Sequence, residues 1–428
     1  MTSISTAELW RRVARAAGID AVYGAPFGPL EVVLVPDALA PTFGAAHQRV
    51  HGRRAAIHRG DGVFVLPAVD VGPRQVVEAG SAEALVADLP VLCGPGEAEL
   101  RLTLGANEPV ADLIPSPPQP EDTWVEPAEE ALAAMDAAAS VVVLAGPGVV
   151  RHGAVPGLHD LAVAAGLGVL NTWGAKGVFD WKSRHHLATV GLQADDFVLS
   201  GLGEVDLIIA TGLDRAESPD RRWKLAPALL LPPGGLAPFA ERCGSGRGTP
   251  RPPPLRDRLA GVTQRGWSVE NTPIPPSRVT LHYAQCLAEG ALIAADPGVA
   301  GFWVARTLGT TRLGAVIVPS SPWPGFAAAC VAVSLLRRPS QPALAVTDRS
   351  AVGPTAAIVD AAATLGLRVP VEVWDPEGDR LDAASHRERL RRLVFGALPS
   401  GGAPSTLATD PGQMAEMIEA AGPIVAWT

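Results

Sequence analysis

Two proline-rich stretches are the feature that most constrains how this chain can fold. The first covers residues 113–127 and the second covers roughly residues 230–279. Because proline lacks a backbone N–H and has a fixed φ, neither stretch is expected to form a helix interior or a central strand. We therefore predict linkers or loops at both places, with domains over residues 1–115, 128–255 and 278–428.

Within these blocks, short apolar runs alternate with alanine-rich segments. Continuous apolar runs that end in Gly, Asp or Thr are typical of strands in a parallel sheet with helices on both faces. Such strands are predicted at residues 20–25, 62–68, 89–94, 140–146, 205–212, 290–296, 314–319, 342–348 and 369–375. Helices are predicted at 156–166 and 353–366, and an amphipathic capped helix within residues 1–18. The predicted class is α/β, with three Rossmann-like, doubly wound parallel-sheet domains in series.

Composition excludes several classes of function. The chain has 35 Lys and Arg against 44 Asp and Glu, a net charge of −9, and no long basic run, so neither nucleic acid nor a membrane surface is an expected partner. Its four cysteines are scattered without a Cys-x-x-Cys pair, which argues against a zinc site and favours a reducing cytoplasm. The sequence contains no run of 18 uncharged apolar residues, so no membrane span is expected.

The middle block resembles the central domain of acetolactate synthase and other thiamine-diphosphate (ThDP) enzymes. The similarity lies in a glycine turn at 146–148, a Thr-x-x-x-Lys-Gly segment at 172–177 and a strand end at 206–212. Some relatives hold FAD in this domain, but a glycine turn alone is a weak signal. A packed domain without a dinucleotide is the preferred interpretation, so FAD is not expected.

The first block resembles the pyrimidine-binding domain of the same family. Gly24 and Pro26 match an opening strand and turn, while Gly72 and Pro73 match a Gly-Pro-Gly turn whose last glycine is Arg74 here. The family places a His-Glu pair before the next helix, and the resemblance implies that its glutamate hydrogen-bonds the cofactor's pyrimidine ring. Gln48 stands in place of that glutamate, and an amide cannot exchange the proton. The resemblance also implies that residues 49–62 form the following helix, with His51 and His58 on its polar face.

The third block resembles the pyrophosphate-binding domain. Asp296, Gly298 and Gly325 match positions near the cofactor, and residues 412–428 match the final helix and last strand. The family binds Mg²⁺ through an Asp in a Gly-Asp-Gly turn, an Asn about 27 residues later and a backbone carbonyl. Here Asp348 is followed by Asp375, since 375 − 348 = 27, and the carbonyl would belong to Glu377.

The residues around Asp348 leave two interpretations open. Thr347 and Arg349 replace the family's glycines, which let backbone N–H groups approach a phosphate. Arg349 could bind a phosphate directly, or it could fill the space of the diphosphate. In the second case Asp348 and Asp375 are remnants of an ancestral metal site.

The resemblance therefore leaves two functions. The preferred one is an acetolactate-synthase-like protein with an eroded cofactor site, which acts as a structural, regulatory or ligand-binding homologue. The alternative is an active ThDP- and Mg²⁺-dependent lyase or carboligase that acts on a 2-oxo acid. In either case we expect a homodimer or homotetramer, or a pairing with a second ThDP-family chain. Helices predicted around 26–35 and 324–336 would bury that contact.

Overall fold

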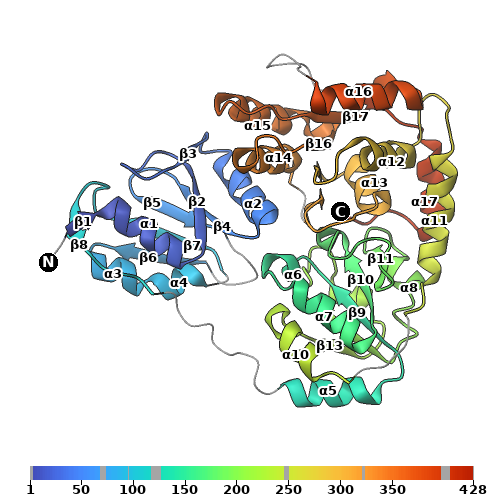
Figure 1. The fold of residues 1–428 in the computed structure, drawn as a ribbon, viewed down its shortest axis with the longest axis horizontal. Coiled ribbons are helices and arrows are strands. Elements are labelled where there is room, and N and C mark those ends of the chain that lie inside the picture. The colour runs from blue at the N-terminus through green and yellow to red at the C-terminus, as the bar shows by residue number, and fades with distance from the viewer. Residues whose placement is uncertain are drawn as a thin grey trace. The chain divides into compact units, whose positions relative to one another are not determined.

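The structure is a computed structural model that describes residues 3–67, 74–94, 96–116, 127–244, 250–320, 323–396 and 405–427. The chain separates into two compact units, Met1–Thr123 and Trp124–Thr428. Figure 1 draws the helices and strands of both units. The class is α/β with mostly parallel sheets, as predicted. The second unit contains two separate sheets, and the division into three domains stays a prediction.

The first unit is built on a six-stranded sheet of order β3-β2-β4-β5-β7-β6, accompanied by a small sheet of β1 and β8. Only β5 departs from the parallel arrangement of the large sheet, because it runs antiparallel to both β4 and β7. The elements are β1 (Ser3–Ser5), α1 (Thr6–Ala16), β2 (Ile19–Gly24), β3 (Val33–Leu34), α2 (Ala40–His51), β4 (Arg54–His58), β5 (Val63–Leu66), β6 (Gln75–Ala79), α3 (Ala82–Ala87), α4 (Leu89–Cys93), β7 (Ala98–Leu102) and β8 (Pro109–Ala111).

Three predictions for the first unit are wrong. Residues 89–94 form helix α4 instead of a strand, because Pro90 occupies its first turn, where no N–H is needed. The expected helix over 49–62 is replaced by the end of α2 and strand β4, whose residues are all buried. Residues 26–35 contain only the short strand β3 and no helix.

The second unit begins with an all-parallel sheet of order β11-β10-β9-β12-β13. Its elements are α5 (Pro127–Ala137), β9 (Val141–Ala145), α6 (Gly148–Arg151), α7 (Val155–Ala165), β10 (Gly168–Thr172), η1 (Trp173–Ala175), β11 (His186–Val190), α8 (Asp196–Leu199), β12 (Leu207–Thr211), α9 (Asp220–Trp223), β13 (Ala228–Leu230), η2 (Pro233–Gly235) and α10 (Leu236–Arg242). Alternate strand residues enter two different cores: Val143 and Ile209 pack with α7 and α10, whereas Val142 and Ile208 pack with Phe197. Burial on both faces explains the continuous apolar runs.

The second sheet of this unit is also all parallel, in the order β15-β14-β16-β17-β18. Its elements are α11 (Pro254–Trp267), α12 (Pro276–Cys286), β14 (Leu292–Ala295), α13 (Val299–Thr307), β15 (Val316–Ile317), α14 (Phe326–Arg337), β16 (Ala343–Asp348), η3 (Arg349–Ala351), α15 (Val352–Thr364), β17 (Val371–Arg380), α16 (Ala383–Phe395), β18 (Ser405–Ala408) and α17 (Gly412–Ala421). The tail after α17 forms one bridge, from Ile424 to Gln193, instead of the expected last strand.

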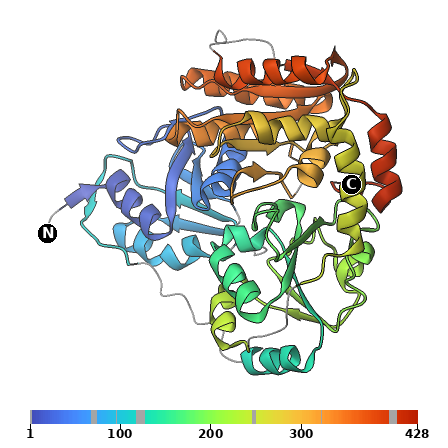
Figure 2. The same ribbon diagram turned by 45° about the vertical axis from the view of Figure 1, so that its right-hand side comes forward.

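The second proline-rich stretch is the main departure from the sequence prediction. Helices α10 and α11 both fall within residues 230–279, where linker or loop was expected. The prolines start helices there instead of interrupting them: Pro254 and Pro276 lie in the first turns of α11 and α12. Helix α11 lies beside α17 in both ribbon views and packs against it (Figures 1 and 2).

Buried polar contacts join the two sheets of the second unit. Arg306 on α13 donates from Nη2 to both carboxylate oxygens of Asp196 on α8, at 2.9 and 2.7 Å, and both side chains are fully buried. Gln193 donates to the carbonyl of Met417 at 2.8 Å, and the indole of Trp173 donates to the carbonyl of Pro319 at 3.1 Å. These contacts fix the relation of the sheets within this unit.

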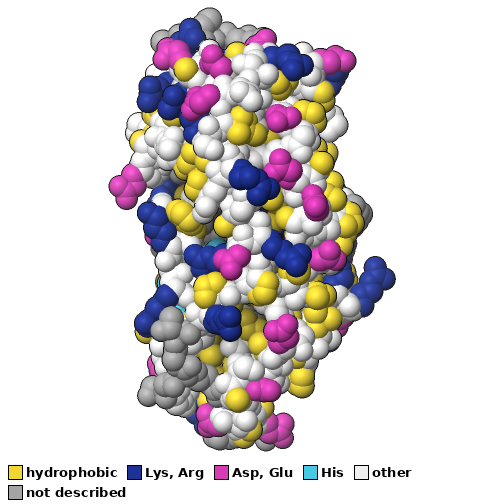
Figure 3. All heavy atoms as spheres, turned by 90° about the vertical axis from the view of Figure 1, so that its right-hand side faces the viewer, with side chains coloured by type: hydrophobic (Ala, Val, Ile, Leu, Met, Phe, Trp, Pro, Cys, Tyr) yellow, Lys and Arg dark blue, Asp and Glu magenta, His cyan; other side chains and the backbone are white. Residues whose placement is uncertain are grey.

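Charged side chains of both signs are mixed on one face of the molecule (Figure 3). On the face drawn in Figure 3, basic and acidic side chains are interspersed among the described residues. No helix in the described part of the chain is long and apolar enough to cross a membrane.

Candidate functional site

Asp296 lies at the carboxyl end of β14, where the resemblance places a cofactor-binding residue. Its carboxylate accepts hydrogen bonds from the backbone N–H groups of Gly325 at 3.1 Å and Ala327 at 2.8 Å. The hydroxyl of Thr347 donates to it at 2.7 Å, and that of Thr355 at 3.4 Å. Gly325 and Ala327 begin helix α14, so Asp296 caps this helix from a buried position. Burial raises the pKa of Asp296 despite these donors.

Asp348 makes the equivalent contact with the neighbouring helix. It ends β16 and accepts from the N–H of Ala300, in the first turn of α13, at 3.1 Å. Gly298 has a φ of 128°, and a Cβ there would lie 2.0 Å from an oxygen of Asp348. Glycine is therefore required at residue 298 by this carboxylate. Burial raises the pKa of Asp348 to about 6, with a further contribution from the nearby charge of Asp296.

Asp375 and Glu377 form a separate cluster around Arg349. Nη1 of Arg349 donates to Glu377 at 2.5 Å and to Asp375 at 3.3 Å, and the N–H of Glu377 donates to Asp375 at 2.9 Å. In the sheet, Asp348 ends β16 and pairs with Trp374, the residue before Asp375. Asp375 itself lies within β17, where the register of the pairing with β18 shifts. Their side chains nevertheless have different partners: Asp348 caps α13, while Asp375 pairs with Arg349.

These contacts test whether the third block offers a place for Mg²⁺ and a diphosphate. Helix N-termini are natural anion sites because their N–H groups lack partners. Here the chain's own carboxylates occupy the N-termini of α13 and α14. Arg349 is paired with acids, and no group of three or more His, Cys, Asp or Glu among the described residues is placed to hold a metal ion. The residues present therefore do not fit a metal-bound diphosphate at this edge of the sheet.

The first unit places the predicted site residues in three different settings. Gln48 lies inside α2, near its C-terminal end, instead of before a helix. Gly24 ends β2 with a φ of 114°, where a Cβ would lie 2.3 Å from the carbonyl oxygen of His58, and Pro26 is exposed. Gly72 and Pro73 lie outside the described residues.

Two of the basic residues singled out in the first unit, His58 and Arg74, have partners within that unit. His58 was expected on a polar face, but it is only 1% exposed, bonds the carbonyl of Ala25 through Nδ1 at 2.7 Å and stacks on Phe64. Arg74 pairs with Glu99 at 2.6 Å and with Glu97 at 3.2 Å. His58 is buried because β4 is a central strand of the sheet, which the helix prediction did not anticipate.

Backbone atoms of a second loop occupy the space beside the glycine turn of the middle block. A Cβ at Gly146 would lie 2.3 Å from the carbonyl oxygen of Gly212, and one at Gly148 would lie 2.7 Å from the Cα of Gly212. The glycines therefore allow two loops to touch, which needs no dinucleotide. Lys176, in the same block, is only 6% exposed, and burial lowers its pKa to about 7, with Arg306 as a second cause.

Sequence reasoning missed a buried network in the third block. Glu372 on β17 accepts a hydrogen bond from the hydroxyl of Tyr283 and contacts Nε2 of His386 at 3.2 Å. Nδ1 of His386 lies 2.8 Å from Nδ1 of His282, and burial lowers the pKa of His282 to about 3. The available signal was a glutamate inside an otherwise apolar strand, residues 369–375.

The fold and this site define an α/β protein with acid-capped helices at the carboxyl edge of a parallel sheet. Comparison with protein families adds a more specific finding: residues 128–227 match the central domain of thiamine pyrophosphate enzymes. The match supports the thiamine-diphosphate-dependent enzyme superfamily, which confirms the resemblance of the sequence at that level. No curated protein shows a significant match to the chain.

Proposed function

We propose that the chain is an acetolactate-synthase-like member of the superfamily that no longer performs ThDP chemistry. It would act as a structural, regulatory or ligand-binding homologue. The observation that carries the proposal is the double capping of α13 and α14 by Asp348 and Asp296. A diphosphate there would have to displace two carboxylates that already satisfy the helix N–H groups, and it would meet their negative charge.

The proton relay supports the same proposal. Gln48 has an amide where the family has a carboxylate, and it lies within α2. Loss of a positioned acid–base group typically costs about 10²–10⁴-fold in rate. Neither the amide group of Gln48 nor its position within α2 favours a role in forming the cofactor ylide.

Turnover tests the proposal directly. The purified chain, supplied with ThDP and Mg²⁺, should not consume pyruvate or release CO₂ from it. Gln48→Glu should be equally inactive, because the capped helices are unchanged. Pyruvate consumption by the chain would overturn the proposal, and a rise in turnover in Gln48→Glu would show that only the relay had been lost.

The alternative function is an active lyase or carboligase on a 2-oxo acid. It is favoured by the placement of Asp348 and Asp375 on the adjacent strands β16 and β17, where Asp348 pairs with Trp374. In that case Arg349, which is 57% exposed, would have to break its ion pairs with Asp375 and Glu377 and bind the phosphate instead.

A homodimer or homotetramer, or a pairing with another chain of the family, remains part of the proposal. The expected contact needs revision, because α14 is buried from Phe326 to Leu335 and residues 26–35 form no helix. Light scattering at micromolar concentration should show an assembly larger than 44.2 kDa, and a monomer in the absence of other chains would contradict a homo-oligomer.

A further inference from the structure

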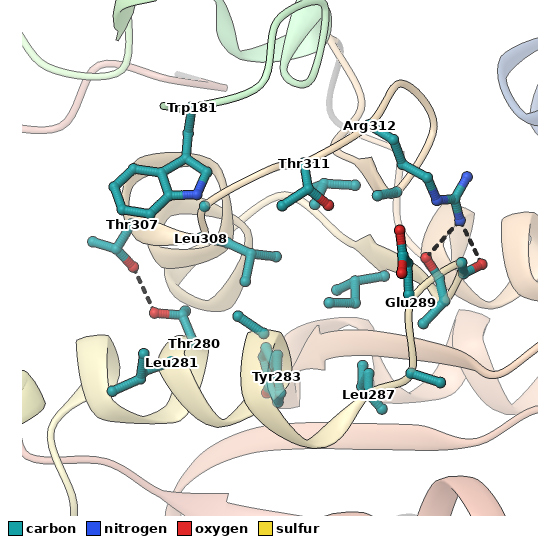
Figure 4. A pocket seen from close by; sticks show the side chains of 18 of the residues that line it. Trp181, Thr280, Leu281, Tyr283, Leu287, Glu289, Thr307, Leu308, Thr311 and Arg312 are labelled. Carbon is teal, nitrogen blue, oxygen red and sulfur yellow. Dashed lines mark hydrogen bonds between the residues drawn. The ribbon is translucent and has the colours of Figure 1, made fainter. Parts of the chain in front are cut away.

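A pocket of about 400 Å³ lies within the second unit, at the C-terminal end of α13 and thus away from the capped N-terminus of that helix. It is bounded by Trp181, by helix α12, by the end of α13 and by the loop that leads to β15 (Figure 4). This volume falls within the range of about 300–1,000 Å³ that is usual for small-molecule sites. We propose that the pocket binds a small α-amino acid with an apolar side chain.

Much of the pocket wall is apolar. It includes Tyr283, Leu287 and Leu308, all buried, while Trp181 at one end remains 37% exposed and can cover a bound group (Figure 4). Gly309 lies directly against this indole, since a Cβ there would be 2.9 Å from Nε1 of Trp181. An aliphatic side chain of moderate size matches such a wall better than a polar one.

The wall is held in place before any ligand arrives. The backbone N–H of Trp181 donates to the carbonyl of Thr310 at 2.8 Å, which joins the loop of Trp181 to the loop that leads to β15. The hydroxyls of Thr280 and Thr307 are 2.7 Å apart, and they link α12 to α13. The hydroxyl of Tyr283 is bound to Glu372. A preformed pocket loses less conformational entropy on binding.

The other end of the pocket carries one charge of each sign. In Figure 4, Arg312 and Glu289 lie at the end opposite Trp181. Nη2 of Arg312 donates to the carbonyl of Gly290 and, at 3.1 Å, to the carbonyl of Ala291. These two bonds anchor the guanidinium group. Its Nε and Nη1 atoms bond to none of the described residues. Glu289 is exposed, and none of the ion pairs among the described residues joins it to Arg312.

A zwitterion is the ligand that matches both charges. Its carboxylate can accept from Nη1 of Arg312, and its ammonium group can donate to Glu289. A simple carboxylic acid would be repelled by Glu289, and a simple amine by Arg312. The α-amino group and carboxylate of one amino acid present both charges together, with the side chain directed towards Trp181. This site is independent of whether ThDP binds.

Calorimetry on the full chain tests the proposal with L-leucine as the probe. We expect saturable binding in the micromolar to millimolar range. The matched analogues 4-methylpentanoate and 3-methylbutylamine each lack one charge and should bind at least about tenfold more weakly, the usual order for a lost charged hydrogen bond. No saturable leucine binding would overturn the proposal, as would equal binding of the acid or the amine.

Variants locate the site. Arg312→Gln and Glu289→Gln should each weaken leucine binding about tenfold, whereas Arg312→Lys should retain more affinity than Arg312→Gln. Arg221→Gln and Glu241→Gln make the same changes of charge outside the pocket lining and should bind like the parent chain. Unfolding temperatures of all variants confirm that each is folded. Leucine binding that survives both Arg312→Gln and Glu289→Gln would place it elsewhere and contradict the proposal.

Discussion

Lys176 is the residue with the clearest conflict between charge and surroundings. Its pKa falls from 10.5 to about 7 because the side chain is buried, and it has no ion pair with any described residue. A lowered lysine pKa means that the folded state binds fewer protons than the unfolded state between pH 7 and 10.5. The free energy of unfolding should therefore rise with pH across this window, so that the chain is less stable at neutral pH than at high pH.

Replacement by an apolar side chain should remove that cost. We expect Lys176→Met to be more stable than the parent chain by about 2–4 kcal/mol at pH 7, and the difference should shrink towards pH 10. Urea unfolding at both pH values measures it. Lys182→Met is the matched control, because Lys182 is exposed and should change stability little. A Lys176→Met chain that is less stable at pH 7 would mean that the ammonium has a stabilising partner.

Helices α8 and α13 depend on one another through a buried ion pair. Arg306 and Asp196 are both fully buried, and Arg306 also donates to the carbonyl of Thr189 at 2.9 Å. Removing one partner leaves a buried charge uncompensated, so Asp196→Asn or Arg306→Met should each cost about 3–5 kcal/mol of unfolding free energy. The double variant should cost less than the sum of the two single variants. A double-mutant cycle measures this coupling, and strict additivity would contradict it.

The sequence predicted strands well where burial on both faces leaves a continuous apolar run. Residues 140–146, 205–212 and 342–348 all contain strands of parallel sheets. The failures share a cause. Residues 89–94 have the same apolar character, but a proline in the first turn is compatible with α4, and periodicity cannot distinguish a short buried helix from a strand. Proline was likewise taken only as a breaker in 230–279, although it also begins helices.

The candidate site was only partly predictable for a different reason. The order of Asp296, Asp348 and Asp375 along the chain indicated that they end strands. Asp296 directly follows β14 and Asp348 ends β16, whereas Asp375 lies within β17. Their partners could not be derived, because capping contacts join residues far apart in sequence: Asp348 and Ala300 are 48 residues apart. Gly298 was interpreted as a position near the cofactor, whereas the group that approaches it is the carboxylate of Asp348.

The molecule as a whole divides into two units, and the contacts within the second unit bear on how it unfolds. Its two sheets share the Arg306–Asp196 pair and the packing of α11 on α17. We expect residues 1–123 and 124–428 each to fold as separate fragments, whereas residues 278–428 alone should be unstable because they lose these contacts. Circular dichroism with thermal unfolding of the three fragments tests this. A stable 278–428 fragment with a cooperative transition would contradict it.

Binding of ThDP to the whole chain tests the central claim most directly, since the claim rests on two helix N-termini that are already capped. Calorimetry with ThDP and Mg²⁺ should detect no micromolar binding to the parent chain. Asp348→Asn, which removes one charge but keeps an acceptor for the N–H of Ala300, should not create tight binding while Asp296 remains. Tight, Mg²⁺-dependent binding of ThDP that is lost in Asp348→Asn and in Asp375→Asn would contradict the claim and establish an intact metal site.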